Sequence, residues 1–281
     1  MNFQLTIEKT AKALLGEGPL WDDRENVLYF VDIEGQSIRK YDPVGGQEWV
    51  LPTPQRVGTI GLCKDGRMLA ALEDGIYFLS QNEFILAHDP CPIEGFRFND
   101  GKVGPDGRFY AGTMSQTGEG AFYRLDPDRT LTRLFGGVST SNGLDWSSDA
   151  KTLYYNDTHD QRTDAFDFDV KRGTVSNRRT VYDYSDERPD GMCIDEHGNL
   201  YVALWGSNKV SIIDPNTHKA VGEIKTPALQ TSCTTFGGSD LGTLYITSAC
   251  VGRLGDAKDI LAGSLFSVKM SVKGVKANLF G

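Results

Sequence analysis

The sequence predicts an all-β fold, a six-bladed β-propeller, and three observations lead to this prediction. Acidic or polar turn residues precede an aliphatic or aromatic strand six times, at intervals of 41 to 47 residues. A repeat of roughly 40–45 residues with several short strands is typical of a propeller blade. No segment has helical periodicity over a convincing length, and Gly and Pro are spread along the chain without a linker. The six turn residues are Asp23, Asp65, Asp106, Asp149, Glu196 and Asp240.

A strand is predicted after each of these turns. The six segments are short and rich in Leu, Tyr, Phe and Val, as buried strands are. They comprise residues 27–31, 68–72, 109–112, 152–156, 200–204 and 243–247. In three repeats the next strand ends in an Asp-Pro dipeptide, which favours a turn. These strands comprise residues 38–41, 122–125 and 210–213.

We expect residues 1–281 to form one domain whose ring is closed by its two termini. A propeller ring closes when a terminal strand completes the last blade. Residues 3–7 have the pattern of a strand, and segments 264–269 and 275–280 are its candidate partners. Truncation at either end is therefore expected to open the ring.

Composition narrows the class of protein. The chain has 281 residues, of which 39% are hydrophobic, enough for a large core. Its net charge of −9, without a cluster of Lys and Arg, argues against nucleic acid as a partner. No apolar run approaches the roughly 20 residues of a membrane span, and residues 1–15 lack the pattern of a secretory signal. We expect a cytoplasmic protein without a membrane partner, as a monomer or a weak homo-oligomer.

The cysteines and histidines do not form a metal or catalytic motif. The five Cys residues show no C-x-x-C spacing, so we expect them to be reduced and mostly buried, although Cys91 lies between two prolines. The four His residues lie outside the repeated phrase, and only His159, which follows a strand of the fourth repeat, lies near it. No G-x-S-x-G elbow or P-loop occurs, which disfavours nucleophilic serine catalysis.

A polar residue followed by Gly recurs at a fixed distance before four of the turns. Glu17, Asp100, Asn142 and Asp190 each precede a turn residue by six positions, counted to Asp23, Asp106, Ser148 and Glu196. The first strand of a blade lines the central channel of a propeller, so we expect these side chains to meet at one mouth. A single Asn-Gly or Asp-Gly is an ordinary turn dipeptide, but agreement across four repeats favours a site.

The oxygen atoms at this position suit a metal ion. Glu17, Asn142 and Asp190 offer two carboxylates and an amide oxygen, with Asn99 and Asp100 close by. Such donors favour Ca²⁺, Mg²⁺ or Mn²⁺, and carboxylates also accept Zn²⁺. Three protein ligands would leave positions open for water and substrate. The alternative is that the acids are solvated residues of the rim.

Arg97 precedes Asn99 by two residues. Its guanidinium offers a fork of donors for the oxygens of a polar ligand. An ion pair with Glu94, Asp100 or another rim acid is an equal alternative.

Several phrases, spread over most of the repeats, resemble those of one family. They are GEGP at 16–19, RFNDGK at 97–102, SNGLDW at 141–146, SNRRT at 176–180, PDGM at 189–192, and TSC at 231–233 leading to FGG at 236–238. On these phrases the chain resembles the gluconolactonase, regucalcin (senescence marker protein) and luciferin-regenerating enzyme family. The resemblance runs almost from end to end.

The resemblance implies a six-bladed propeller that binds one divalent cation and hydrolyses sugar lactones to aldonic acids. It implies Glu17, Asn142 and Asp190 as metal ligands, with Asp190 also the general base. Arg97 and Asn99 correspond to substrate contacts. The metal could be Ca²⁺, Zn²⁺, Mn²⁺, Mg²⁺ or Fe²⁺.

At the third repeat the family pattern and the spacing disagree by one residue. The spacing makes Asp100 equivalent to the other ligands, whereas the family pattern assigns Asn99 to the site. We follow the family pattern for Asn99. We expect Asp100 to lie behind the ligands, in contact with them and not with the metal or the substrate. The chain also departs from regucalcin-like members in a shorter segment, 115–120, where a lid acid contacts substrate. Glu119 is the one acid available there as a substrate contact.

The expected mechanism is attack of a metal-activated water on the lactone carbonyl, with Asp190 accepting the proton of that water. One alternative is phosphotriester cleavage at the same metal, but related propellers usually bring a histidine to the channel for it. Another is a non-catalytic, calcium-binding regulatory propeller. Arg97 and Asn99 favour a small-molecule pocket over this last alternative.

Overall fold

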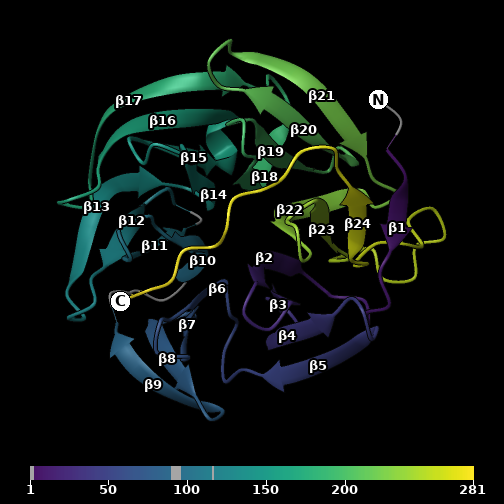
Figure 1. Cartoon of the computed structure of the whole chain (residues 1–281), viewed down its shortest axis with the longest axis horizontal. Helices are drawn as coiled ribbons and strands as arrows, with labels where there is room; N and C mark the ends of the chain where they lie inside the picture. The colour runs from purple at the N-terminus through teal and green to yellow at the C-terminus, as the bar shows by residue number, and fades with distance from the viewer. Residues whose placement is uncertain (1–2, 90–95, 116) are drawn as a thin grey trace.

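The computed structural model describes residues 3–89, 96–115 and 117–281, which form antiparallel β-sheets arranged as a ring (Figure 1). Four of the sheets have four strands each, paired in chain order. The all-β prediction is confirmed. The strands of these sheets are β2 (Gly16–Asp22), β3 (Val27–Asp32), β4 (Ser37–Asp42) and β5 (Gln47–Pro52); β6 (Thr59–Leu62), β7 (Met68–Ala71), β8 (Ile76–Ser80) and β9 (Glu83–His88); β10 (Arg97–Val103), β11 (Phe109–Met114), β12 (Gly120–Leu125) and β13 (Leu131–Val138); and β14 (Ser141–Trp146), β15 (Thr152–Asp157), β16 (Arg162–Asp169) and β17 (Thr174–Asp183).

The remaining strands form one curled sheet of eight strands. They are β1 (Leu5–Ile7), β18 (Arg188–Ile194), β19 (Leu200–Trp205), β20 (Lys209–Asp214), β21 (Lys219–Lys225), β22 (Gln230–Gly237), β23 (Thr243–Ala249) and β24 (Phe266–Lys269). A single residue pair, Trp205 with Gln230, joins β19 to β22. The fold is therefore a propeller-like ring of four sheets and one larger sheet with a narrow junction.

The hydrophobic core lies between neighbouring sheets. Between the sheets β10–β13 and β14–β17, for example, Tyr110, Phe122, Tyr155 and Phe166 form one buried aromatic cluster. The ring centroids of Phe122 and Tyr155 are 5.1 Å apart in a T-shaped arrangement, a geometry that aromatic pairs favour. The strands β2, β6, β10, β14, β18 and β22 lie innermost and surround the axis of the ring (Figure 1).

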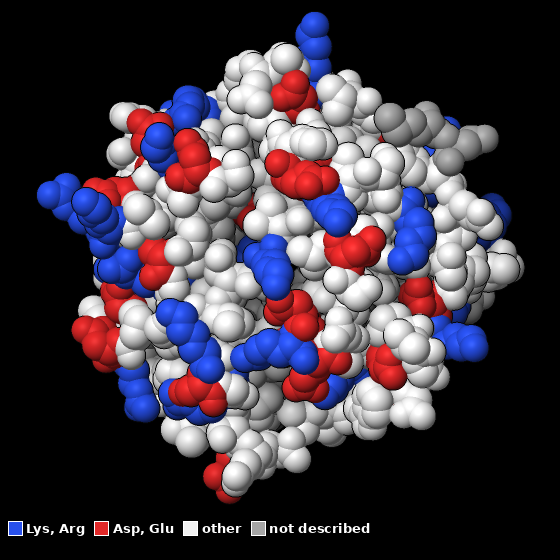
Figure 2. Space-filling view, in the orientation of Figure 1, with Lys and Arg blue, Asp and Glu red and all other residues white. Residues whose placement is uncertain are grey.

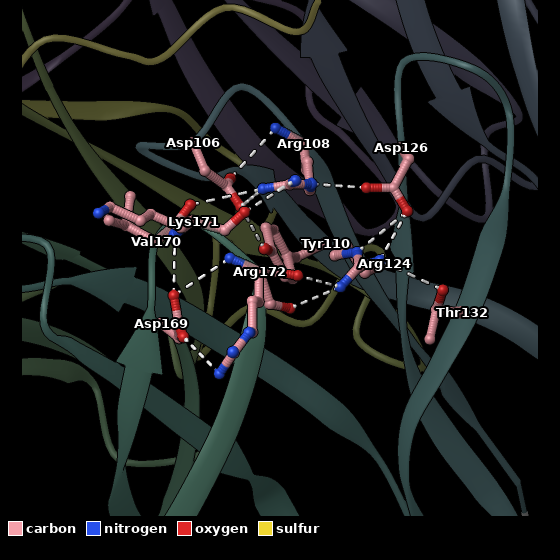
Figure 3. A network of polar contacts seen from close by, with 11 residues as sticks. Asp106, Arg108, Tyr110, Arg124, Asp126, Thr132, Asp169, Val170, Lys171 and Arg172 are labelled. Atoms are coloured by element: carbon pink, nitrogen blue, oxygen red, sulfur yellow. Dashed lines mark hydrogen bonds and ion pairs between the residues drawn. The ribbon is translucent and has the colours of Figure 1, made fainter.

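Polar contacts add a second connection between the same two sheets (Figure 3). Arg108 binds Asp106 at 2.7 Å, and Arg124 binds Asp126 at 2.7 Å. Arg124 Nη1 also donates to the backbone oxygen of Arg172 at 2.7 Å, in the turn between β16 and β17. The arginines are oriented by carboxylates of their own sheet and reach the backbone of the next one, which holds the two sheets at a defined angle.

The two termini take different courses. The predicted N-terminal strand corresponds to β1, which pairs with β24 inside the predicted segment 264–269. The other candidate partner, segment 275–280, does not pair with β1. It crosses one face of the ring (Figure 1) and ends with Phe280 bridged to Cys63. The cause is burial, because the Phe280 ring lies 6.0 Å from that of Phe78 and is 5% exposed.

Four of the five cysteines are described, and each is free and buried, as predicted. Cys91 lies outside the described residues. No helix within residues 3–89, 96–115 and 117–281 combines the length and the apolar character needed to cross a membrane.

The contact made by the C-terminal tail predicts a measurable stability effect. We expect Phe280→Ala to lower the free energy of unfolding by about 3 kcal/mol, because truncation of a buried Phe leaves a cavity. Thermal melting of this variant against Val275→Ala, a tail residue that is 49% exposed, measures the difference. Equal melting temperatures of the two variants would show that the tail does not stabilise the ring.

Candidate metal centre at one mouth of the ring

A β-bulge interrupts five of the hairpins formed by an inner strand and its neighbour. In each, the pairing register shifts after the first residues of the inner strand, so that two residues are left unpaired. The unpaired residues are 18–19, 99–100, 142–143, 190–191 and 232–233. Bulges re-aim side chains and are frequent next to active sites. The hairpin of β6 and β7 keeps a regular register.

The bulges bring the predicted polar residues together at one mouth of the central channel. Asn99, Asn142 and Asp190 are each the first residue of a bulge, and Glu17 directly precedes one. With Arg97 they line a cavity of about 240 Å³. Each of the five side chains is no more than 8% exposed. Residues separated by more than 170 positions in the sequence therefore share one buried site.

The bulge register answers the question of Asn99 against Asp100. Asn99 has the same place in its bulge as Asn142 and Asp190, whereas Asp100 comes second. Asp100 lines a different cavity of about 190 Å³, further along the channel and under tail residues 275–278. The spacing pointed to Asp100 because the turn residues used for the count differ in position: Asp106 is the third residue after its inner strand, and Glu196 the second.

Hydrogen bonds hold the amide side chains in fixed orientations. Asn99 Nδ2 donates to Asn142 Oδ1 at 3.0 Å and to the backbone oxygen of Ser141 at 2.7 Å. Asn142 Nδ2 in turn donates to Thr158 Oγ1 at 2.6 Å. Asn142 Oδ1 thus uses one of its two lone pairs, and the second is available to a ligand.

The two carboxyl groups of the site lie against each other in a buried environment. Burial raises the pKa of Glu17 to about 8, and the negative charge of Asp100 adds to this effect. Burial and the neighbouring Glu17 carboxyl raise the pKa of Asp190 well above its ordinary value. Buried like charges disfavour ionisation of both groups. A positive ion between them would remove this penalty.

These donors fit a divalent cation. Glu17 and Asp190 contribute carboxylate oxygens and Asn142 an amide oxygen, the donor types that Ca²⁺, Mg²⁺ and Mn²⁺ prefer. Among the residues that the structure describes, no three His, Cys, Asp or Glu side chains come together in a metal-binding group. Asp100 lines the other cavity. A cation at this site would have two carboxylates and one amide as protein ligands, and its other coordination positions would be open to water and substrate.

Arg97 is the buried cation next to this cluster. Its Nη1 donates to Asn99 Oδ1 at 2.6 Å and to the Phe98 carbonyl at 3.0 Å. Burial and the nearby charge of Arg56 lower the pKa of the Arg97 guanidinium to about 10, so it stays protonated at neutral pH. No ion pair between Arg97 and an acid occurs within residues 3–89, 96–115 and 117–281, and Glu94 lies outside them. The other donors of the fork can serve a ligand in the cavity.

The structure does not bring Glu119 into the cavity. Its side chain is exposed, and its Oε2 accepts a hydrogen bond from Thr117 Oγ1 at 2.8 Å in the same short loop. The residues that line the cavity do not include it. A short loop folds back on itself through these contacts, and this explains the difference from the sequence-based assignment.

His159, noted in the sequence, is exposed near the rim, with Nδ1 3.3 Å from Thr140 Oγ1. Several other residues at the mouth were not predicted. The cavity is also lined by Leu15, Ile33, Met114, Thr140, Thr158, Arg188 and Trp205. Many of them lie where an inner strand starts or its neighbour ends, so the hairpin register was the signal that could have located them.

Comparison with known proteins gives consistent similarities. A family model described as the SMP-30/Gluconolactonase/LRE-like region matches residues 15–250. Regucalcin of Xenopus laevis is 38% identical over 296 residues that cover 100% of this chain and 98% of that protein. YvrE of Bacillus subtilis, provisionally named a sugar lactone lactonase, is 38% identical over 95% of both chains.

Solved structures with the same arrangement include a luciferin-regenerating enzyme, with a TM-score of 0.94 and 28% identity over 99% of both chains. A regucalcin of Agrobacterium tumefaciens, described as a calcium-binding protein, has a TM-score of 0.93 and 25% identity. That comparison covers 99% of this chain and 98% of the other.

The raised pKa of Glu17 predicts an unusual pH dependence in metal-free protein. Between the ordinary value of 4.5 and about 8, the unfolded chain has released this proton and the folded chain retains it. Glu17 therefore lowers stability as pH rises through this range. We expect Glu17→Gln to raise the melting temperature by several degrees at pH 8 and by little at pH 5. Glu83→Gln, an exposed site on β9, is the control, and equal shifts at both pH values would contradict the assignment.

Proposed function

The chain belongs to the SMP-30/gluconolactonase/LRE-like family, and on this premise we propose that it hydrolyses sugar lactones to aldonic acids with one divalent cation. The observation that carries the proposal is the cavity of about 240 Å³ in which two buried carboxyls, an amide oxygen and a buried arginine meet. Its size suits one small ring. The relative YvrE, with its lactonase name, supports the substrate class.

Glu17, Asn142 and Asp190 would hold the cation. Bound there, a cation supplies Lewis acidity to the lactone carbonyl and lowers the pKa of a water. Oxygen donors favour Ca²⁺, Mg²⁺ or Mn²⁺ and also accept Zn²⁺ or Fe²⁺. The calcium-binding description of the Agrobacterium tumefaciens regucalcin supports Ca²⁺ among these ions.

Side chains of the cavity would accept the proton, bind the substrate and orient the amide ligand. Asp190 accepts the proton of the attacking water. Coordination would lower its basicity, but burial and the adjacent Glu17 raise its pKa, which offsets part of that loss. Arg97 donates to ring or hydroxyl oxygens, and its bond to Asn99 holds its guanidinium in place. The network from Asn99 to Thr158 fixes the amide of Asn142 in one orientation, in which its oxygen would serve as a ligand.

A non-catalytic calcium-binding propeller is the second candidate, favoured by the calcium-binding description of a relative. Such a protein needs the oxygen ligands but has no use for a buried guanidinium beside them. Phosphotriester cleavage has less support, because no histidine is among the residues that line the cavity. His159 reaches only the rim.

We further propose that the ring has six blades, formed by one domain of residues 1–281. The two groups of the eight-stranded sheet pack against each other through a buried cluster that includes Tyr201, Val210, Phe236 and Leu244, as neighbouring sheets do elsewhere. On the face that the tail crosses, Lys and Arg are interspersed with Asp and Glu (Figure 2). This mixed surface supports a small-molecule partner over nucleic acid.

An assay panel tests the proposed activity. Metal-free protein would be supplied with Ca²⁺, Mg²⁺, Zn²⁺, Mn²⁺ or Fe²⁺ and offered five- and six-membered aldonolactones and a phosphotriester. We expect lactone hydrolysis that depends on added metal and is absent without it. Hydrolysis of the phosphotriester alone would favour the other hydrolase, and activity on none of them would favour the binding protein.

The same assay distinguishes the base from the ligand role of Asp190. Asp190→Asn retains an oxygen ligand but cannot accept a proton, so we expect turnover to fall by at least about 100-fold while metal stays bound. Metal content is measured on the same sample, with Glu83→Gln as the control. Full turnover with metal bound would remove Asp190 as the base.

A further inference from the structure

The rim of the candidate metal centre carries a second arginine. Arg188 begins β18 and is the register partner of Trp205, the last residue of β19. Side chains of directly paired residues lie on the same face of a sheet, roughly 5 Å apart at Cβ. Both residues line the cavity that contains Glu17 and Asp190. Arg188 is exposed and Trp205 half-buried, so they form the outer wall of the cavity while Arg97 lies in its buried part.

Two acids close to Arg188, Glu187 and Asp160, are paired with other cations. Glu187 Oε1 lies 2.9 Å from Lys209 Nζ. Asp160, in the short helix η1 (Thr158–Asp160), pairs with Arg178 at 2.6 Å and with Arg162 at 3.1 Å. No ion pair that involves Arg188 occurs in the part of the chain that the structure describes. Arg188 therefore lies at the exposed edge of the cavity without an ion pair of its own.

The charge balance of the loaded cavity favours an anionic ligand. A divalent cation would neutralise the two carboxylates of Glu17 and Asp190. Arg97 and Arg188 would then leave the cavity with a positive charge at each end. A neutral lactone is served by the cation at its carbonyl and by Arg97 at its ring or hydroxyl oxygens. A second guanidinium at the far end matches a negatively charged substituent, which it can bind through two parallel hydrogen bonds.

We propose that the preferred substrate is a sugar lactone with an anionic group, a phosphate or a carboxylate, at the end remote from the lactone carbonyl. This inference rests on the lactonase activity proposed above. Arg188 binds the anionic group, and the indole of Trp205 provides an apolar wall beside the sugar. Arg188 is thus a specificity-determining residue, and Trp205 limits the directions from which the ring can enter.

The test compares substrates that differ in the remote group. Metal-loaded protein is assayed with D-glucono-1,5-lactone, its 6-phosphate, and D-glucaro-1,4-lactone, which carries a carboxylate. We expect kcat/KM for one anionic lactone to exceed that for the neutral lactone by at least about tenfold. Arg188→Gln should lower this ratio by about tenfold or more, and Arg188→Lys should recover part of it. Arg133→Gln, an exposed arginine on the outer strand β13, is the charge-matched control and should leave the ratio unchanged.

Binding gives a readout that is independent of turnover. Calorimetry of the metal-loaded protein with gluconate 6-phosphate, glucarate and gluconate should show tighter binding of an anionic-end compound, and Arg188→Gln should abolish the difference. Comparison of gluconate 6-phosphate with glucarate shows whether a phosphate or a carboxylate is preferred. The inference would be overturned if kcat/KM were similar for the anionic and the neutral lactone, or if Arg188→Gln left a high preference for the anionic lactone unchanged. In either case the proposed lactonase activity would stand. No hydrolysis of any lactone would overturn the lactonase itself, and this inference with it.

Discussion

The candidate site depends on one backbone constraint, the β-bulge near the start of the inner strands. Regular pairing would turn successive side chains to alternate faces, and each blade would present a polar residue to the axis only by coincidence. The bulges at 99–100, 142–143 and 190–191 re-aim the first unpaired side chain in the same way. Since the inner strands surround one axis, three local irregularities in the backbone produce one shared site.

The same constraint brings two carboxyl groups together in a buried place, where their negative charges would repel each other. Glu17 and Asp190 lose hydration and are held next to each other, which raises the pKa of both. Stability alone would not favour such a pair, because buried charges need compensation. A divalent cation supplies that compensation, and the energy of this buried pair then becomes binding energy for the metal. The amide network from Arg97 to Thr158 adds orientation without adding negative charge.

Much of the fold could be predicted because its signals are local and repeated. The strand after each turn and the spacing of the turns depend on neighbouring residues, and the all-β ring follows from them. Site residues were harder. Asp100 and Asn99 could not be distinguished by counting, because the count ran to turn residues that occupy different places in their loops. Glu119 was misplaced because a short loop closes on itself through Thr117, and Arg188 and Trp205 were missed because their position depends on hairpin register.

The central claim is that the bulged inner strands create a cation site from Glu17, Asn142 and Asp190. Anomalous X-ray diffraction from crystals of the protein loaded with Mn²⁺ tests this claim most directly. The account predicts a single strong anomalous peak at the mouth of the channel, within coordination distance of oxygens from all three side chains. A peak that lies elsewhere, or on the Asp100 side of the channel, would contradict it.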